Sequence, residues 1–243
     1  MRRVDGVLFD IDDTLVDTRG AFAVALSGVA RRYLPDGPAG RDEELLTVWR
    51  ADVNGHYASY TRGEASFAEQ RMARANELHA QFGGPVLDGP GYARWADEFD
   101  EDFSGAWAAH DDASEVVDRL LVAGLAVGAL SNAAVDKQTE KLERTALLNR
   151  VPMLVGVDTL GFGKPDPRVF LEACRRLGTD PARTAYVGDE LDVDAVAARE
   201  AGLVGVWVDR PGTRRLPLTD DQVAAAGVQV VTTLDDLPAA LGL

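Results

Sequence analysis

Three aspartates, Asp10, Asp12 and Asp13, follow an apolar segment near the start of the chain. That segment, Val4–Phe9, is a short apolar run typical of a buried strand. Carboxylates at the end of such a strand lie at the carboxyl edge of the sheet, where open α/β sheets bind ligands. Because crowded carboxylates repel one another, we expect a hard divalent cation with oxygen ligands to bind there.

A second acidic cluster, with Asp189 and Asp194, follows another apolar run. The run Thr184–Val187 predicts a strand, so this cluster is expected at the same edge of the sheet. A turn from strand to helix lets both carboxylates face one cation. The alternative interpretation is that these acids complement the positive end of a helix dipole.

Two further elements carry groups that bind anions. Lys164, one of only three lysines, stands between glycine and proline on a constrained loop, where its ammonium can bind a phosphate as a point charge. Ser131 and Asn132 end a third apolar run, where a hydroxyl and the N–H groups of a helix start form an anion site. The simpler interpretations are a solvated lysine and an ordinary helix N-cap. Pro165 after the lysine excludes a Walker P-loop.

Taken together, the four elements combine carboxylates for a cation with a hydroxyl and an ammonium for an anion. A divalent ion beside a phosphate site is what phosphoryl transfer requires, because positioning and charge neutralisation provide most of its catalysis. The residues therefore indicate an enzyme of phosphoryl transfer.

Apolar runs predict the strands that must position these residues. They are Val4–Phe9, Leu125–Leu130, Met153–Val157, Thr184–Val187, Val204–Val208 and Val228–Val231. Helical patterns alternate with the later runs and stop at glycines suited to C-caps: Ala113–Ala123, Pro167–Leu177 and Val193–Ala201. This alternation predicts an α/β fold with a Rossmann-like, doubly wound and mostly parallel sheet.

A long helical segment interrupts this alternation between Leu15 and Gly124. Helical patterns recur there at Ala21–Leu34, Asp42–Ala58, Ser66–Gln81 and Tyr92–Asp102, and Ser66 and Glu69 have the spacing of a capping box. Residues 83–91, rich in glycine and proline, predict a loop. We therefore expect an α/β core at 1–16 and 105–243, with an α-helical cap inserted at 17–104.

The four motifs occur in the order found in the haloacid dehalogenase superfamily of phosphohydrolases, which the sequence resembles. They are Asp10-Ile11-Asp12-Asp13-Thr14, then Ser131, then Lys164-Pro165-Asp166-Pro167, then Gly188-Asp189 with Asp194. The resemblance covers the core, and the helical insert corresponds to the family's cap. It implies a Mg²⁺-dependent phosphomonoester hydrolase that acts on a small phosphorylated metabolite through an aspartyl-phosphate.

The resemblance also implies roles for individual residues. Asp10 would be the nucleophile, and Asp12 the acid and then the base. Mg²⁺ would be held by Asp10, the backbone carbonyl of Asp12, and Asp189, with Asp194 holding a metal-bound water. The phosphoryl oxygens would be bound by Ser131, Asn132 and Lys164.

Other features of the resemblance narrow the activity. Asp12 argues against dehalogenation, because the dehalogenases of the superfamily lack the second aspartate and the magnesium dependence. Asp13 stands where the phosphatases commonly have glycine. Between two predicted helices of the cap, Tyr60 and Arg62 are candidates for substrate specificity, against the simpler interpretation of a turn with a solvated arginine.

Two alternatives to a phosphatase use similar residues. A sugar-phosphate mutase of the same superfamily would return the phosphoryl group to its substrate. A phospho-acceptor signalling module resembling a receiver domain would share the acidic Mg²⁺ pocket, hydroxyl and lysine. The chain length, the cap and Asp12 argue against the signalling module, because a lasting signal gains nothing from an acid that speeds dephosphorylation.

Composition limits the partners. The 243 residues include 25 basic and 40 acidic side chains, a net charge of −15, which disfavours nucleic acids and anionic membranes. No stretch approaches the ~18 apolar residues of a membrane span. A single cysteine, Cys174, favours a reducing compartment, and it is expected to be a buried thiol on a helix. We therefore expect a cytoplasmic protein whose partner is a small phosphorylated metabolite; the sequence carries no indication of an oligomeric state.

Overall fold

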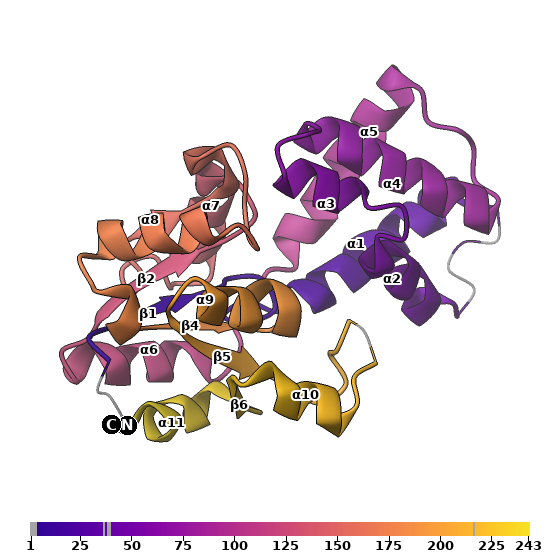
Figure 1. Cartoon of the computed structure of the whole chain (residues 1–243). Helices are drawn as coiled ribbons and strands as arrows, with labels where there is room; N and C mark the ends of the chain where they lie inside the picture. The colour runs from indigo at the N-terminus through magenta and orange to yellow at the C-terminus, as the bar shows by residue number, and fades with distance from the viewer. Residues whose placement is uncertain (1–3, 36, 38–39, 216) are drawn as a thin grey trace. The chain divides into compact units, whose positions relative to one another are not determined.

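The computed structural model describes residues 4–35, 37, 40–215 and 217–243 (Figure 1). The chain divides into two compact units. One is formed by Met1–Asp17 with Ala109–Leu243, and the other by Thr18–Ala108. Each unit has its own architecture, and the predicted strands all fall in the first.

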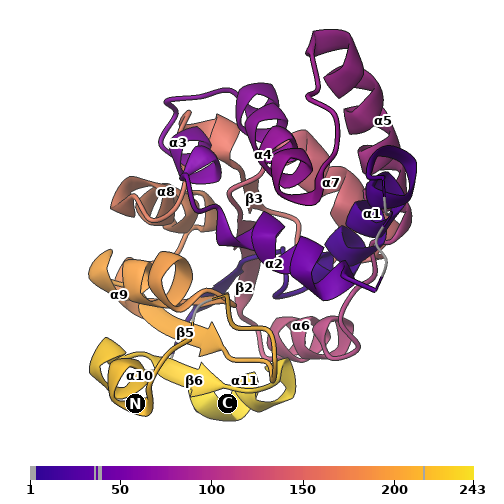
Figure 2. The ribbon, with the colours of Figure 1, turned by 90° about the vertical axis from the view of Figure 1, so that its right-hand side faces the viewer.

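The first unit is built on a parallel sheet that, within the described residues, has six strands in the order β3-β2-β1-β4-β5-β6. The strands are β1 (Gly6–Phe9), β2 (Ala126–Leu130), β3 (Leu154–Val155), β4 (Thr184–Gly188), β5 (Val204–Val208) and β6 (Gln229–Val231). Figure 2 shows β5 and β6 side by side and pointing the same way. Five of the six predicted apolar runs contain one of these strands, and the sixth, Thr184–Val187, is one residue shorter than β4. The prediction of a Rossmann-like, doubly wound sheet is confirmed.

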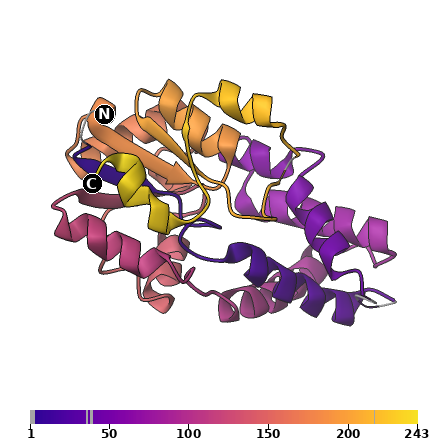
Figure 3. The same cartoon turned by 90° about the horizontal axis from the view of Figure 1, so that it is seen from below.

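Helices cover both faces of this sheet. They are α6 (Ala113–Val122), α7 (Val135–Arg144), α8 (Pro167–Leu177), α9 (Ala197–Glu200), α10 (Asp220–Ala226) and α11 (Leu237–Leu241), with the short helices η1 (Val157–Thr159), η2 (Pro181–Arg183), η3 (Leu191–Val196) and η4 (Leu234–Asp236). Helices α8 and α9 lie on one face, and α6 and α11 on the other (Figures 1 and 3). Because both faces are covered, the central strands are buried along almost their whole length.

Helix α8 fixes the loop that carries Lys164, because its apolar side is packed against the sheet. Phe170 and Cys174 are buried in a cluster with Leu8 of β1 and Tyr186 of β4. The rings of Phe170 and Tyr186 meet edge to face, with their centroids 5.0 Å apart. Packing of this kind leaves α8, and the loop before it, little freedom to shift.

The second unit is helical throughout its described residues. Its helices are α1 (Thr18–Tyr33), α2 (Asp42–Ala51), α3 (His56–Thr61), α4 (Phe67–Phe82) and α5 (Gly89–Gly105). The predicted capping box opens α4, where Ser66 Oγ accepts from Glu69 N at 3.2 Å and Glu69 accepts from Ser66 N at 2.8 Å. No helix in the described parts of either unit has the length and apolar character needed to cross a membrane.

Three details of the predicted helices are wrong. The predicted helix Asp42–Ala58 is broken at Asp52, whose φ is 44° and whose carboxylate accepts from the N–H groups of Tyr57 and Ala58 at the start of α3. That side chain offers the backbone an alternative to continuing the helix. The predicted helix Val193–Ala201 begins as the π-type helix η3 and becomes α-helical only in α9. The predicted loop 83–91 contains the start of α5, where Asp88 accepts from Gly91 N at 2.7 Å as an N-cap.

Candidate active site

Strand β1 places the first motif in the middle of the sheet. It pairs with β2 on one side and β4 on the other, with Phe9 opposite Ala129 and Val187. The chain leaves the strand at Asp10, whose N–H donates to Val187 O at 2.8 Å and which is only 6% exposed. Asp10 therefore lies at the carboxyl edge of the sheet where the strand order reverses, the usual place for a ligand in this architecture.

The backbone turns sharply after Asp12. Asp13 has φ of 58°, and its N–H donates to Val16 O at 2.8 Å. This left-handed conformation suits glycine, and aspartate is one of the few other residues that adopt it at modest cost. The conformation explains why Asp13 is acceptable where glycine is common in the superfamily that the sequence resembles.

Lys164 is buried at the centre of the site. Its Nζ lies 2.9 Å from Asp10 Oδ1, 2.7 Å from Asp194 Oδ1 and 2.8 Å from the Tyr186 hydroxyl. Burial by itself lowers the pKa of Lys164, but the carboxylates of Asp10 and Asp194 outweigh it and raise that pKa well above its ordinary value. The lysine is therefore a permanent positive charge beside the two aspartates.

The backbone of Lys164 is held by Asn132. The side-chain amide of Asn132 accepts from Lys164 N at 2.6 Å and donates to Lys164 O at 3.0 Å. A Cβ on Gly163 would lie 2.2 Å from Asn132 Oδ1, so the loop approaches the amide this closely only with glycine there. Both polar groups of the Asn132 side chain are thus bonded to the lysine's backbone.

Three carboxylates form a group that can hold a metal ion. Asp10, Asp189 and Asp194 each offer an oxygen, and the three oxygens lie within 4.8 Å of one another. Burial raises the pKa of Asp10 to about 7, with Lys164 opposing and Asp194 adding to the shift. Burial also raises the pKa of Asp189 well above its ordinary value, and the neighbouring carboxylate of Asp13 adds to it. Oxygen donors with this excess of negative charge fit a hard divalent cation such as Mg²⁺.

Helix η3 brings Asp194 back toward the strand that precedes it. Asp194 Oδ2 accepts from Glu190 N at 2.9 Å, while Oδ1 faces Lys164. A Cβ on Gly188 would lie 2.4 Å from the Asp194 side chain, so glycine at the end of β4 is needed for this approach. Both oxygens of Asp194 are therefore already engaged by the protein.

Ser131 directly follows β2 and is connected to Asp12 by Gln138, which, like Lys141 one turn further on, the sequence did not single out. Gln138 Nε2 lies 2.7 Å from Ser131 Oγ and 2.6 Å from Asp12 Oδ2. Lys141 forms an ion pair with Asp12 Oδ1 and is 3% exposed. The signal that could have found them is two polar residues three positions apart, one of them a scarce lysine, shortly after Ser131.

Tyr186 is a third side chain that the sequence did not single out. Its hydroxyl donates to Leu130 O at 2.9 Å and lies beside Lys164 Nζ. Inside the apolar run that predicted β4, a tyrosine looks like core, and only the structure shows that its polar end reaches the lysine.

The two candidate specificity residues, Tyr60 and Arg62, lie in the second unit. Arg62 is exposed and donates to Glu64 at 2.6 Å and to Ser59 at 3.1 Å. The ring of Tyr60 packs beside those of Tyr57 and Phe67, at 6.0 and 5.5 Å between centroids. Their role in substrate specificity stays a prediction.

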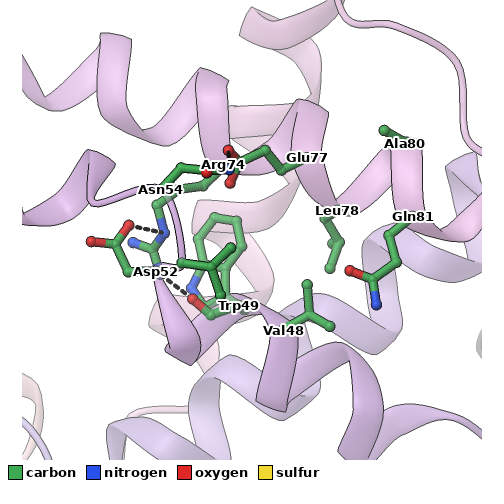
Figure 4. A pocket seen from close by; sticks show the side chains of 10 residues that line it. Val48, Trp49, Asp52, Asn54, Arg74, Glu77, Leu78, Ala80 and Gln81 are labelled. Atoms are coloured by element: carbon green, nitrogen blue, oxygen red, sulfur yellow. Dashed lines mark hydrogen bonds and ion pairs between the residues drawn. The ribbon is translucent and has the colours of Figure 1, made fainter.

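The second unit also has a cavity of about 310 Å³ of its own, between α2 and α4 (Figure 4). Arg74 lines it, stacks over the Trp49 ring at 4.2 Å and donates to Trp49 O at 2.5 Å. Burial lowers the pKa of Arg74 to about 10, and Asp52 opposes that shift. None of the predicted site residues lines this cavity.

The chain is similar in sequence to known phosphatases over most of its length. The chain is 28% identical over 236 residues to a glyceraldehyde 3-phosphate phosphatase of Methanothermobacter thermautotrophicus, covering 95% of each chain. It is 30% identical over 201 residues to an N-acetylmuramic acid 6-phosphate phosphatase of Pseudomonas aeruginosa, covering 82% of this chain and 79% of the relative.

A solved structure shows the same fold. The L-2-haloacid dehalogenase of Xanthobacter autotrophicus superposes with a TM-score of 0.75 at 22% identity, covering 98% of each chain. The sequence model of the haloacid dehalogenase-like hydrolases matches residues 4–202, which include all four motifs. The chain therefore belongs to the haloacid dehalogenase-like hydrolase family.

Proposed function

We propose that the protein is a magnesium-dependent phosphatase that hydrolyses phosphate monoesters of small metabolites through an aspartyl-phosphate on Asp10. The observation that supports this most is the pairing of buried Asp10 with Lys164 at 2.9 Å, beside two further carboxylates. The two relatives described above are named as phosphatases of different phosphorylated metabolites, which supports the reaction class and leaves the substrate to be found by screening.

Asp10, Asp189 and the backbone carbonyl of Asp12 are the proposed ligands of Mg²⁺. Both oxygens of Asp194 are engaged by Lys164 and Glu190 N, which supports an indirect role through a bound water. When bound, the ion supplies positive charge that offsets the repulsion among the carboxylates and the charge of the phosphoryl group.

In the proposed reaction, a carboxylate oxygen of Asp10 forms a bond to phosphorus while the bond from phosphorus to the alcohol oxygen breaks. The carboxyl group of Asp12 gives its proton to that alcohol. Water then attacks phosphorus, Asp12 takes a proton from it, and the bond between Asp10 and phosphorus breaks to release inorganic phosphate. A nucleophile cannot also deliver the proton, so a second carboxyl group is required.

The phosphoryl oxygens are proposed to be bound by the Ser131 hydroxyl and the Lys164 ammonium. The Asn132 side chain is bonded to the backbone of Lys164, so we assign Asn132 the task of positioning that lysine, and only its backbone N–H remains for an anion. The two hydrogen bonds from the Asn132 side chain fix the position of the backbone from which the Lys164 side chain extends.

Asp12 distinguishes the proposed phosphatase from a dehalogenase, an activity found in a protein of the same fold. Cleavage of a carbon–halogen bond releases a halide that needs no proton, so an acid two residues after the nucleophile has no leaving group to protonate there. A sugar-phosphate mutase would use the same residues, and analysis of the products formed with a bisphosphate activator separates a mutase from a hydrolase.

A panel of phosphate monoesters assayed with Mg²⁺ and with a chelator tests the proposal. We expect phosphate release that requires Mg²⁺ and falls by about 10³-fold or more in Asp10→Asn, because the nucleophile is removed. Asp118→Asn, which changes an exposed carboxylate of α6 paired with Arg150, is the matched control and retains full activity. Absence of activity toward every ester, or activity that survives Asp10→Asn, contradicts the proposal.

A further inference from the structure

We propose that Gln138 and Lys141, one turn apart on α7, are positioning residues for Asp12, and that Gln138 also sets the direction of the Ser131 hydroxyl. This inference rests on the proposed function, because it takes Asp12 as the acid and base of the reaction. It concerns residues that no sequence motif singled out.

The amide of Gln138 connects the acid to the phosphate site. Gln138 is fully buried, and its Nε2 lies 2.6 Å from Asp12 Oδ2 and 2.7 Å from Ser131 Oγ. A carboxylate only accepts hydrogen bonds, so the nitrogen of the amide must face Asp12. The two hydrogens of one NH₂ group are therefore shared between the acid and the serine.

This arrangement determines what the Ser131 hydroxyl can do. Ser131 Oγ accepts from Gln138 Nε2, and also from Ala133 N at 3.3 Å. A hydroxyl has two acceptor lone pairs and one donor hydrogen, so two incoming hydrogen bonds leave its O–H to donate. The hydroxyl is thus prepared to donate to an acceptor such as a phosphoryl oxygen.

Lys141 holds the other oxygen of the acid. Its Nζ pairs with Asp12 Oδ1, while Gln138 takes Oδ2, so both oxygens of a side chain that is 35% exposed are fixed from one helix. Lys164 forms an ion pair with Asp10 instead. Two of the three lysines therefore pair with different carboxylates of the first motif, Lys164 with Asp10 and Lys141 with Asp12.

Positioning matters for an acid because proton transfer requires the carboxyl group within hydrogen-bond reach of the leaving oxygen. Asp12 lies beyond the end of β1, outside the sheet, where its backbone forms an isolated bridge with Val16. Without Gln138 and Lys141 its partly exposed carboxylate would sample other rotamers. The rate of ester cleavage would then fall for leaving groups that need a proton, and much less for those that depart as stable anions.

The test compares kcat/KM for two esters, an alkyl phosphate taken from the active substrates and p-nitrophenyl phosphate, whose leaving group needs no proton. This parameter reports the steps up to cleavage of the ester bond. We expect Lys141→Met to lower kcat/KM for the alkyl ester by about 10-fold or more beyond its effect on p-nitrophenyl phosphate. Asp12→Asn shows the same selectivity with a larger loss.

Gln138→Leu is expected to show that selectivity together with a raised KM for both esters, because Ser131 loses its orientation. Lys137→Met is the matched control: Lys137 lies on the same helix, is 42% exposed and pairs with Glu140, and its variant keeps the wild-type ratio of the two esters. Lys141→Arg keeps the positive charge beside Asp12 and restores most of the alkyl-ester activity.

The outcomes separate this inference from the proposed function. If Lys141→Met and Gln138→Leu lose activity equally toward both esters, or lose none, the two residues only stabilise the fold and the inference is wrong. If Lys141→Met fails to fold, Lys141→Arg is measured in its place. If Lys141→Arg has reduced activity but the same ratio of kcat/KM for the two esters as wild type, the inference is also wrong. If wild type hydrolyses no ester of the panel with Mg²⁺, the proposed function itself fails.

Discussion

Asp10 and Asp12 are two residues apart in the chain but have different surroundings. Asp10 is buried against Lys164 and the acidic cluster, whereas the side chain of Asp12 is 35% exposed and faces Gln138 and Lys141. The backbone turns at Asp13, whose φ is positive, directly after Asp12. Two carboxylates with distinct environments can take distinct tasks, one as a nucleophile and one as an acid.

A prediction at this scale concerns Asp12 alone. Asp12→Ala is expected to slow turnover by about 10²-fold or more, because the leaving alcohol loses its proton donor. Mg²⁺ binding is expected to persist, since the proposed contact to the ion uses the backbone carbonyl, which the substitution keeps. Steady-state kinetics and a Mg²⁺ titration measure the two effects, and turnover equal to wild type would remove Asp12 from the mechanism.

At the scale of elements, a single carboxylate joins several segments of the first unit. Asp112, before α6, accepts from both Nη atoms of Arg210 at 2.8 Å, from the Thr233 hydroxyl at 2.8 Å and from Leu234 N at 2.9 Å. Arg210 also donates to Thr14 O, at the end of the first motif. This network therefore ties the starts of α6 and η4 to the loop after β1.

The network predicts how the stability of the fold depends on pH. Burial by itself raises the pKa of Asp112, but its hydrogen bonds to Arg210, Leu234 and Thr233 outweigh this and lower it to about 2 from 3.8. A lowered pKa means that the stabilisation is present above about pH 4 and is lost as the pH falls toward about 2. After allowance for solvent screening, that stabilisation is about 1–2 kcal/mol.

Asp112→Asn tests this pH dependence. The variant is expected to be less stable than wild type at pH 6, and the difference should shrink as the pH approaches 2, because wild type then loses the charge as well. Chemical denaturation across that range measures the free energy of unfolding. Asp235→Asn, an exposed aspartate of η4, is the control, and the prediction is wrong if Asp112→Asn and this control have the same pH profile.

Among the elements, α7 is the one whose importance could not be predicted. Its sequence is strongly polar, and its buried positions are Gln138, Lys141 and Leu142. A helix is detected in a sequence by apolar residues at helical spacing, and here two of the three buried residues are polar. These polar residues are buried because they contact the carboxylate of Asp12, which lies in the loop after β1, more than a hundred residues earlier in the chain.

At the scale of the whole molecule, the sheet order concentrates negative charge at one point. Strand β1 lies between β2 and β4, so the first and last motifs, distant in the sequence, meet at neighbouring strand ends. Burying these carboxylates together is unfavourable in the protein without a cation. The fold therefore contains a local electrostatic repulsion that lowers its stability and that a bound metal ion would relieve.

Metal binding is therefore expected to stabilise the folded protein. Saturating Mg²⁺, at about 100 times its Kd, should raise Tm by roughly 5 °C or more, because the ion binds only the folded state. Asp189→Asn should lose that shift and, without Mg²⁺, melt above wild type, since the substitution removes one of the mutually repelling charges. Differential scanning calorimetry with and without Mg²⁺ measures both effects.

Asp192→Asn is the matched control for this prediction. Asp192 lies in the same segment, but its side chain is 63% exposed and pairs with Arg215, so its variant should keep the Mg²⁺-dependent rise in Tm. A wild-type Tm that Mg²⁺ leaves unchanged would contradict the proposed metal site.

The sequence by itself determined the strands, the class of fold, the aspartates and the serine at the strand ends, and the lysine of the loop before α8. It could do so because buried parallel strands are short apolar runs and their carboxyl ends carry the polar residues. Only the tertiary structure decided what surrounds each of them. Gln138, Lys141 and Tyr186 reach the site through contacts between distant segments, and the Asn132 amide turns to the Lys164 backbone, because hydrogen-bond partners depend on three-dimensional proximity that no local pattern encodes.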